Sequence, residues 1–346
     1  LTKAFTYTNV GYMEDVPVLE MTDKAAKIMV NGYIGWIAND ISSGTYNMKL
    51  IPRNQVYNPS YYTVKNGDLI HYISANMEST SSVGGTSLVI GKAPSYLKEG
   101  VKYLSYDGNY FYEYTNSNLE SKLNSLIGEY RTGSRMGAVN KSSTFYNYYQ
   151  YLSFRSKTSY TAAELDRFIN NNTVSTSKLR GLGASLKDAE NKYGVNALIM
   201  LGVAMNESAL GTSYYAMTRN NLFGIAAFDS DPNQATTFKT PGDSVLEFAK
   251  NYISAGYADP ADWRYYGGFV GNKYRGVNIK YASDPYWGEK AAQHAYSIDK
   301  YLSGGNTNLK EANSKFIGMV KGNSVVIDGS GRELYKISTS LNDYAS

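Results

Sequence analysis

Residues 196–224, NALIMLGVAMNESALGTSYYAMTRNNLFG, decide the fold of this chain. The first part of the stretch, Ala197–Met205, is apolar on every side of a helical wheel, and a helix of this kind is normally buried on all faces. A carboxylate, Glu207, follows directly. The sequence therefore predicts a central buried helix that ends beside an acidic side chain.

Glu207 stands where an ionised carboxylate is costly. Beside an apolar wall the pKa of a carboxyl group rises, so the group can stay protonated near neutral pH, as a general acid must. The following residues, 211–224, are rich in Gly, Thr, Ser, Tyr and Asn, which could supply amide and hydroxyl groups to a polar substrate. A structural alternative stays open, because many helices end in a solvated Glu that has no catalytic role.

Two motifs in order resemble a known family. Asn206–Gly211 (NESALG) with Asn221–Ile225 (NLFGI) is similar to the signature of the bacterial endo-β-N-acetylglucosaminidases of glycoside hydrolase family 73, the autolysin glucosaminidases. Tyr281–Trp287 (YASDPYW) is similar to the Tyr-Ala-Thr-Asp-Pro element of that family. The resemblance runs from about residue 145 to about residue 302. It implies a mainly helical, lysozyme-like domain in which Glu207 is the catalytic acid and Tyr281 lies in the active site.

The resemblance also implies a mobile β-hairpin lobe over the cleft at residues 226–240, which in the family often carries a second acidic residue. Here the lobe has no Glu, and its only carboxylates are Asp229 and Asp231. Either Asp could activate water for an inverting reaction, or both could be exposed turn residues beside Pro232. We favour participation of the substrate's own 2-acetamido oxygen, because an N-acetylglucosamine substrate brings that nucleophile with it.

Aromatic and polar side chains near the motifs are candidates for binding sugar, since an aromatic ring with a polar tip can stack on a sugar face. Tyr281 and Asn221 could position or polarise the acetamide. The loop at 263–274 suits either sugar stacking or a packed corner, and Asp284 with Pro285 is explained as the start of a helix. The candidate substrate-binding residues are Asn221, Phe223, Gly224, Tyr257, Trp263, Tyr286 and Trp287.

Composition excludes several classes of enzyme. The chain has no Cys, which removes disulfides and thiol nucleophiles, and with them the thiol-type wall peptidases. Its two histidines, His71 and His294, are too few and too far apart in sequence for most zinc hydrolase sites. We expect both to be structural or on the surface, and we expect no metal and no cofactor.

Charge and hydropathy indicate the partners. A net charge of +4 is spread along 346 residues without a basic block, which argues against nucleic acid but suits loose attraction to an anionic wall polymer. The longest apolar run, Ala197–Met205, is much shorter than the roughly 20 residues of a membrane span. We expect a secreted, wall-associated monomer that acts on peptidoglycan glycan strands. Because Leu1 is followed by no basic-then-apolar leader, we expect a mature or excised fragment.

The chain is expected to be α+β. Its first part shows short alternating runs broken by Gly, Asn and Pro, with Asn31-Gly32 as a hairpin turn. This part resembles a bacterial SH3-type wall module, the alternative being a β appendage with no binding role. The expected segments are a β-rich module at 1–92, a small aromatic β and linker segment at 93–144, the catalytic domain at 145–305 and a C-terminal extension at 306–346.

Local signals predict further elements. Thr161 and Glu164 form a capping box before a helix to about residue 171, Ser185–Tyr193 is a helix closed by Gly194, and Asp243 or Ser244 caps a helix through residue 253. A hairpin at 101–114 around Asp107-Gly108, a helix at 119–130, helical spacing at 310–320 and strands at 324–329 and 334–337 complete the prediction.

Three functions of different classes stay open. The first is an endo-β-N-acetylglucosaminidase that cuts the GlcNAc-β-1,4-MurNAc bond of peptidoglycan, and the motifs favour it. The second is a lytic transglycosylase or muramidase, which can share a helical core and a lone Glu. The third is a wall-binding protein whose catalytic domain is inactive, against which the presence of Glu207 argues.

Overall fold

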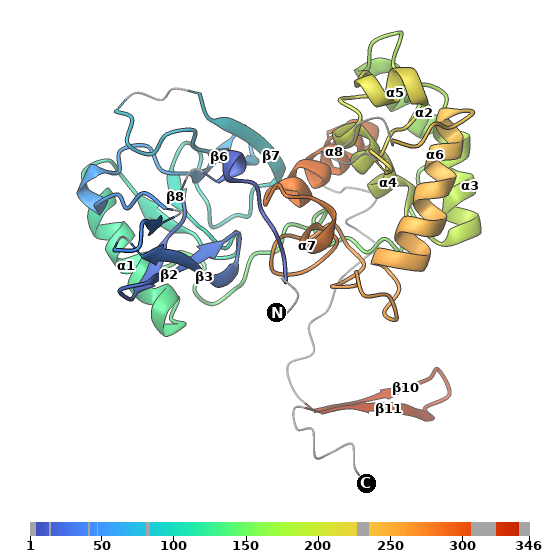
Figure 1. Cartoon of the computed structure of the whole chain (residues 1–346). Helices are drawn as coiled ribbons and strands as arrows, with labels where there is room; N and C mark the ends of the chain where they lie inside the picture. Colours follow the sequence, from blue (N-terminus) through green and yellow to red (C-terminus); the bar gives the residue numbers. More distant parts are fainter. Residues whose placement is uncertain are drawn as a thin grey trace.

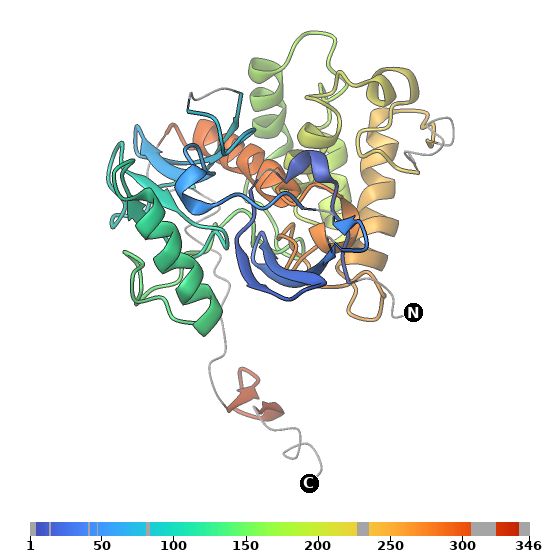
Figure 2. The ribbon, with the colours of Figure 1, turned by 60° about the vertical axis from the view of Figure 1, so that its left-hand side comes forward.

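The computed structural model describes residues 5–13, 15–40, 42–46, 48–80, 84–226, 235–305 and 323–338. An N-terminal domain of strands with one long helix lies beside a helical domain (Figures 1 and 2). The expected mixture of α and β elements is confirmed.

The first sheet of the N-terminal domain is antiparallel, with the strand order β1-β2-β3-β4. Asn31 (φ 42°) and Gly32 (φ 84°) join β2 to β3, so the predicted hairpin turn is confirmed. Its strands are β1 (Val18–Met21), β2 (Ala25–Val30), β3 (Tyr33–Asp40) and β4 (Thr45–Tyr46), and short 3₁₀ turns lie at Val10–Tyr12 and Arg53–Gln55.

The second sheet has the order β7-β6-β5-β8-β9 and is covered by the helix α1 (Leu119–Thr132), which buries the predicted apolar stripe. Because β8 is hydrogen-bonded to β5, one sheet contains strands from both sides of residue 92, while the expected segment bounds stay predictions. The resemblance to an SH3-type module stays a prediction. The strands are β5 (Tyr61–Lys65), β6 (Asp68–Ile73), β7 (Thr86–Lys92), β8 (Lys102–Leu104) and β9 (Tyr112–Tyr114).

The helical domain confirms most of the predicted helices. The capping box of Thr161 and Glu164 opens α2, and Gly194 (φ 63°) ends α3. Two predicted starts were wrong. The cap of α6 is Thr240, with Asp243 as the third helical residue, and α8 begins at Trp287, after the Asp284 turn rather than at it. The helices are α2 (Ala162–Asn172), α3 (Gly183–Tyr193), α4 (Ala197–Glu207), α5 (Tyr214–Arg219), α6 (Pro241–Glu247), a π-helix (Phe248–Tyr257), α7 (Asn278–Tyr281) and α8 (Trp287–Leu302).

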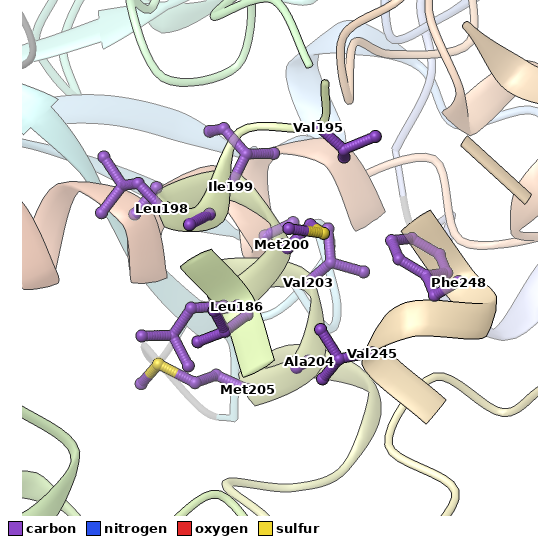
Figure 3. Close-up of a cluster of buried hydrophobic side chains, with 14 of the residues drawn as sticks. Leu186, Val195, Leu198, Ile199, Met200, Val203, Ala204, Met205, Val245 and Phe248 are labelled. Atoms are coloured by element: carbon purple, nitrogen blue, oxygen red, sulfur yellow. The ribbon is translucent and has the colours of Figure 1, made fainter. Parts of the chain in front are cut away.

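The core of the helical domain is built around α4. All residues from Ala197 to Met205 are buried, as predicted, and Figure 3 shows side chains of α3, α6 and the π-helix gathered around them. The helix α8 crosses α4 at Gly202, where a Cβ atom would lie only 2.8 Å from the Ala291 carbonyl oxygen. This close crossing brings the start of α8 to the end of α4.

A buried contact between His71 and Glu289 joins the two domains. His71 Nδ1 on β6 lies 2.6 Å from Glu289 Oε2 on α8, and Tyr62 on β5 donates to Glu289 Oε1 at 3.2 Å. The prediction of a structural role for His71 agrees with this contact. Burial lowers the pKa of the other histidine, the half-buried His294 of α8, to about 4. The N-terminal domain thus packs directly on the helix that begins with Trp287.

The C-terminal part contains the antiparallel pair β10 (Ser324–Ile327) and β11 (Glu333–Ile337), which confirms the two predicted strands. The helical spacing predicted at 310–320 lies outside the described residues, as do residues 227–234 of the predicted lobe. Residues 235–240, also in that predicted lobe, form no strand. None of the described helices is long and apolar enough to cross a bilayer.

Candidate active site

Glu207 is the last residue of α4 and is half-buried. Two donors reach its Oε1 atom: the indole Nε1 of Trp287 at 2.5 Å and Nδ2 of Asn206 at 3.1 Å. Burial raises the pKa of Glu207, the two hydrogen bonds lower it in part, and the charge of Asp284 raises it again, so that the pKa lies above its ordinary value. The carboxyl group is therefore suited to carry a proton to a substrate.

The other carboxyl oxygen of Glu207, Oε2, lies near Gly224, which has no side chain. A Cβ atom at Gly224 would lie 3.8 Å from Glu207 Oε2, and the φ angle of 62° at Gly224 is left-handed, which favours glycine. Gly224 therefore lies beside the oxygen for which neither Trp287 nor Asn206 is a donor.

Asn221 shapes that loop. Its Oδ1 accepts from Phe223 N and Ile225 N, and its Nδ2 donates to the carbonyl oxygens of Ile225 and Thr236. Asn221 is also 1% exposed. The prediction that Asn221 polarises the substrate acetamide conflicts with this geometry, because both amide donors already bind backbone oxygens.

Tyr281 contacts Trp287, which is the residue that donates to Glu207. Its hydroxyl donates to Phe223 O at 2.9 Å, and its ring is tilted against that of Trp287 with centroids 4.7 Å apart. Burial raises the pKa of Tyr281 well above its ordinary value, and the charge of Glu207 adds to the effect. Tyr281 is thus a neutral hydroxyl donor next to the residues that hold Glu207.

The structure brings some predicted residues together and separates others. Three of the predicted substrate-binding residues are buried aromatic rings that pack around Tyr281 or its neighbours: Phe223, Tyr257 and Trp287. They support the site from below its surface. Trp263 is 62% exposed on the loop after the π-helix. Tyr286 turns toward the N-terminal domain, with its ring 5.4 Å from that of His71.

The remaining predicted residues, Asp229 and Asp231, lie outside the described residues. Sequence reasoning missed that Trp287 and Asn206 are hydrogen-bond donors to Glu207, although both stand in the quoted motifs. It also missed the buried Lys273, because a lone lysine between Asn272 and Tyr274 gives no signal of burial. No group of acidic and His side chains that could hold a metal ion occurs in the part of the chain that the structure describes.

Comparison with known proteins points to one family. The family model described as glucosaminidase, mannosyl-glycoprotein endo-β-N-acetylglucosaminidase, matches residues 183–300. A putative endo-β-N-acetylglucosaminidase of Streptococcus pneumoniae is 33% identical over 216 residues, which is 60% of this chain and 31% of that protein. A β-N-acetylglucosaminidase of Bacillus subtilis is 27% identical over 140 residues, 36% of this chain and 16% of that protein. The chain thus spans a third or less of these relatives.

Solved structures with some likeness are of autolysins. A catalytic mutant of Staphylococcus aureus autolysin E in complex with the disaccharide NAG-NAM aligns with a TM-score of 0.38 at 18% identity, over 56% of this chain and 82% of that chain.

Proposed function

We infer that this chain, whose residues 183–300 form a glucosaminidase domain of glycoside hydrolase family 73, is a peptidoglycan hydrolase. We propose that it cleaves the β-1,4 bond between N-acetylglucosamine and N-acetylmuramic acid inside wall glycan strands. The single observation that supports this proposal best is the half-buried Glu207, whose pKa is raised and whose second oxygen lies beside Gly224.

In the proposed reaction Glu207 is the general acid. Its carboxyl proton passes to the glycosidic oxygen as the bond to the anomeric carbon breaks. The 2-acetamido oxygen of the same N-acetylglucosamine attacks that carbon and forms a cyclic oxazolinium. Water then opens the ring, and the Glu207 carboxylate takes a proton back from this water.

Tyr281 is proposed to assist at the acetamide. Its raised pKa keeps the hydroxyl protonated, so the group can donate a hydrogen bond to substrate when it leaves the Phe223 carbonyl. The rival for the second role is a carboxylate, Asp229 or Asp231, acting on water. The variants Asp229→Asn and Asp231→Asn, made separately, decide between the routes: if either loses as much activity as Glu207→Gln, the acetamido route is wrong.

Muropeptide analysis tests the bond that is cut. Purified peptidoglycan is digested, reduced with borohydride and analysed by mass spectrometry, and the proposal expects reduced N-acetylglucosamine at the new end. A reduced N-acetylmuramic acid end would identify a muramidase, an anhydro end a lytic transglycosylase, and wall binding without release of fragments a binding protein. Glu207→Gln is the matched control, since it keeps the size and neutral polarity of the protonated acid. We propose that the protein is secreted and acts at the cell wall.

A further inference from the structure

The short helix α7 (Asn278–Tyr281) places Tyr281 in the site but cannot hold its own shape. It has a single turn, and an isolated helix of this length is unstable in water. Its conformation therefore depends on contacts from other parts of the chain. The backbone carbonyl groups of residues 278–283 show where these contacts come from.

Lys273 binds both ends of this turn. Its Nζ atom donates to Asn278 O at 2.9 Å and to Ala282 O, the carbonyls on either side of Tyr281. Lys273 is 0% exposed, and in the described part of the chain its hydrogen-bond acceptors are carbonyl oxygens rather than a carboxylate. Burying an ammonium group is costly, and here the two carbonyl dipoles, the ring of Tyr7 at 5.2 Å from Nζ and the charge of Asp284 offset part of the cost. A change at Lys273 therefore acts first on the turn around Tyr281.

The N-terminal segment binds the same turn from another side. Thr6 Oγ1 donates to Ile279 O at 2.8 Å, the Tyr7 hydroxyl to Lys280 O at 3.2 Å, and the backbone N–H of Asn9 to Ser283 O at 3.0 Å. Figure 1 shows this segment running past α7 on its way into the N-terminal domain. About 270 residues of sequence separate these partners.

We propose that Lys273, Thr6, Tyr7 and Asn9 are positioning residues that hold Tyr281 against the Phe223–Gly224 loop for catalysis. This inference rests on the proposed function, because it assumes that Tyr281 assists the hydrolase reaction. The four residues Thr6, Tyr7, Asn9 and Lys273 are called the Tyr281 clamp. In this view the N-terminal domain contributes to the active site itself, since its first residues fix a turn that borders Glu207.

The test measures kcat and KM separately on soluble, uncrosslinked glycan strands. A displacement of about 1 Å at a reacting group can cost up to about 100-fold in rate, so Lys273→Met should lower kcat by about tenfold and change KM by less than about threefold. Lys192→Met is the matched control, because Lys192 lies exposed on α3 and pairs with Asp188, and it should keep wild-type kcat.

The N-terminal half of the clamp is tested without touching a buried charge. The double variant Thr6→Val with Tyr7→Phe removes two donors and little volume, and should lower kcat by about threefold or more. Thr6→Ser keeps the hydroxyl and should keep wild-type kcat. Wild-type kcat in the double variant would overturn the inference, even if Lys273→Met fails to fold in a thermal scan.

A double-mutant cycle separates this inference from the proposed function. Tyr281→Phe alone should lower kcat by about tenfold or more, and adding Lys273→Met should then lower it by less than about twofold further. If the two losses multiply, Lys273 does not act through Tyr281 and the clamp is wrong, although the role of Tyr281 stands. If Tyr281→Phe has wild-type kcat, the proposed role of Tyr281 is wrong and the clamp with it.

Discussion

The crossing of α4 and α8 at Gly202 links the packing of the core to the chemistry of Glu207. In Gly202→Ala the new Cβ would lie 2.8 Å from Ala291 O and 3.2 Å from Ala295 N, whereas ordinary contact begins near 3.4 Å. The two helices must therefore separate by about 0.6 Å, since neither neighbour is a flexible side chain. Because α4 ends at Glu207 and α8 begins at Trp287, this separation strains the hydrogen bond between them.

The cost follows from two opposing effects. Overpacking of a close-packed core typically lowers the free energy of unfolding by about 1–3 kcal/mol. Replacing a glycine inside a helix by alanine raises it by up to about 1 kcal/mol. We expect a net loss of up to about 2 kcal/mol in the free energy of unfolding. For a domain of this size the loss lowers Tm by up to about 8 °C. The misplaced donor should also lower kcat/KM by about tenfold or more.

Differential scanning calorimetry and the rate of glycan-strand cleavage measure the two effects. Gly128→Ala is the matched control, because Gly128 lies exposed in α1 and a Cβ atom there would meet nothing within 4 Å; it should gain up to about 1 kcal/mol and keep its activity. Wild-type stability and activity in Gly202→Ala would refute the reasoning, since α4 and α8 would then not be in direct backbone contact.

Three further variants test the electrostatics. Glu207→Gln should lower kcat by about 100-fold or more in the muropeptide assay. Because folding raises the pKa of Glu207, the native state binds this proton more tightly, so its stabilising effect is present at low pH and is lost as pH rises above 4.5 through the folded pKa. Urea unfolding at several pH values should therefore show Glu207→Gln gaining on the wild type as pH rises, and a constant difference would contradict the raised pKa. Trp287→Phe removes a hydrogen bond that lowers the pKa of Glu207, so the basic limb of the pH profile of kcat should move to higher pH; a shift to lower pH would exclude this role. His71→Ala removes one of the two hydrogen-bond partners of the buried Glu289 and should cost about 1–3 kcal/mol in urea unfolding, much of it recovered when Glu289→Gln is added; an unchanged loss in the double variant would count against this contact.

Local patterns predicted the helices well where the signal lay within a few residues. The capping box at Thr161 begins α2, and Gly194 ends α3. Both signals act within their own helix, so these helix ends do not depend on distant contacts. The predicted start of α8 was wrong because a residue type that can cap a helix does not always do so. Asp284 offers a cap, but it accepts from Tyr286 N and pairs with Lys290, and the helix begins only at Trp287.

The expected break at residue 92 shows the same limit. The sequence analysis placed a β-rich module before residue 93 and a linker segment after it, yet β5 pairs with β6 on one side and with β8 on the other. Strand pairing depends on which edges meet in space, and a sequence contains no direct record of it. Asn221 shows this limit too, because a side-chain amide that binds its own loop and one that binds substrate have the same local sequence.

The sequence by itself determined that an all-round apolar helix lies at the centre of a domain and ends at Glu207, because burial of such a helix is the only way to remove its whole surface from water. Only the tertiary structure decided what surrounds that carboxyl group. The indole of Trp287 comes from 80 residues further along the chain, and the donors Thr6 and Tyr7 to the turn of Tyr281 come from near its beginning. These contacts are directional hydrogen bonds between distant segments, which form once packing has set the segments side by side and leave no periodic pattern in the sequence.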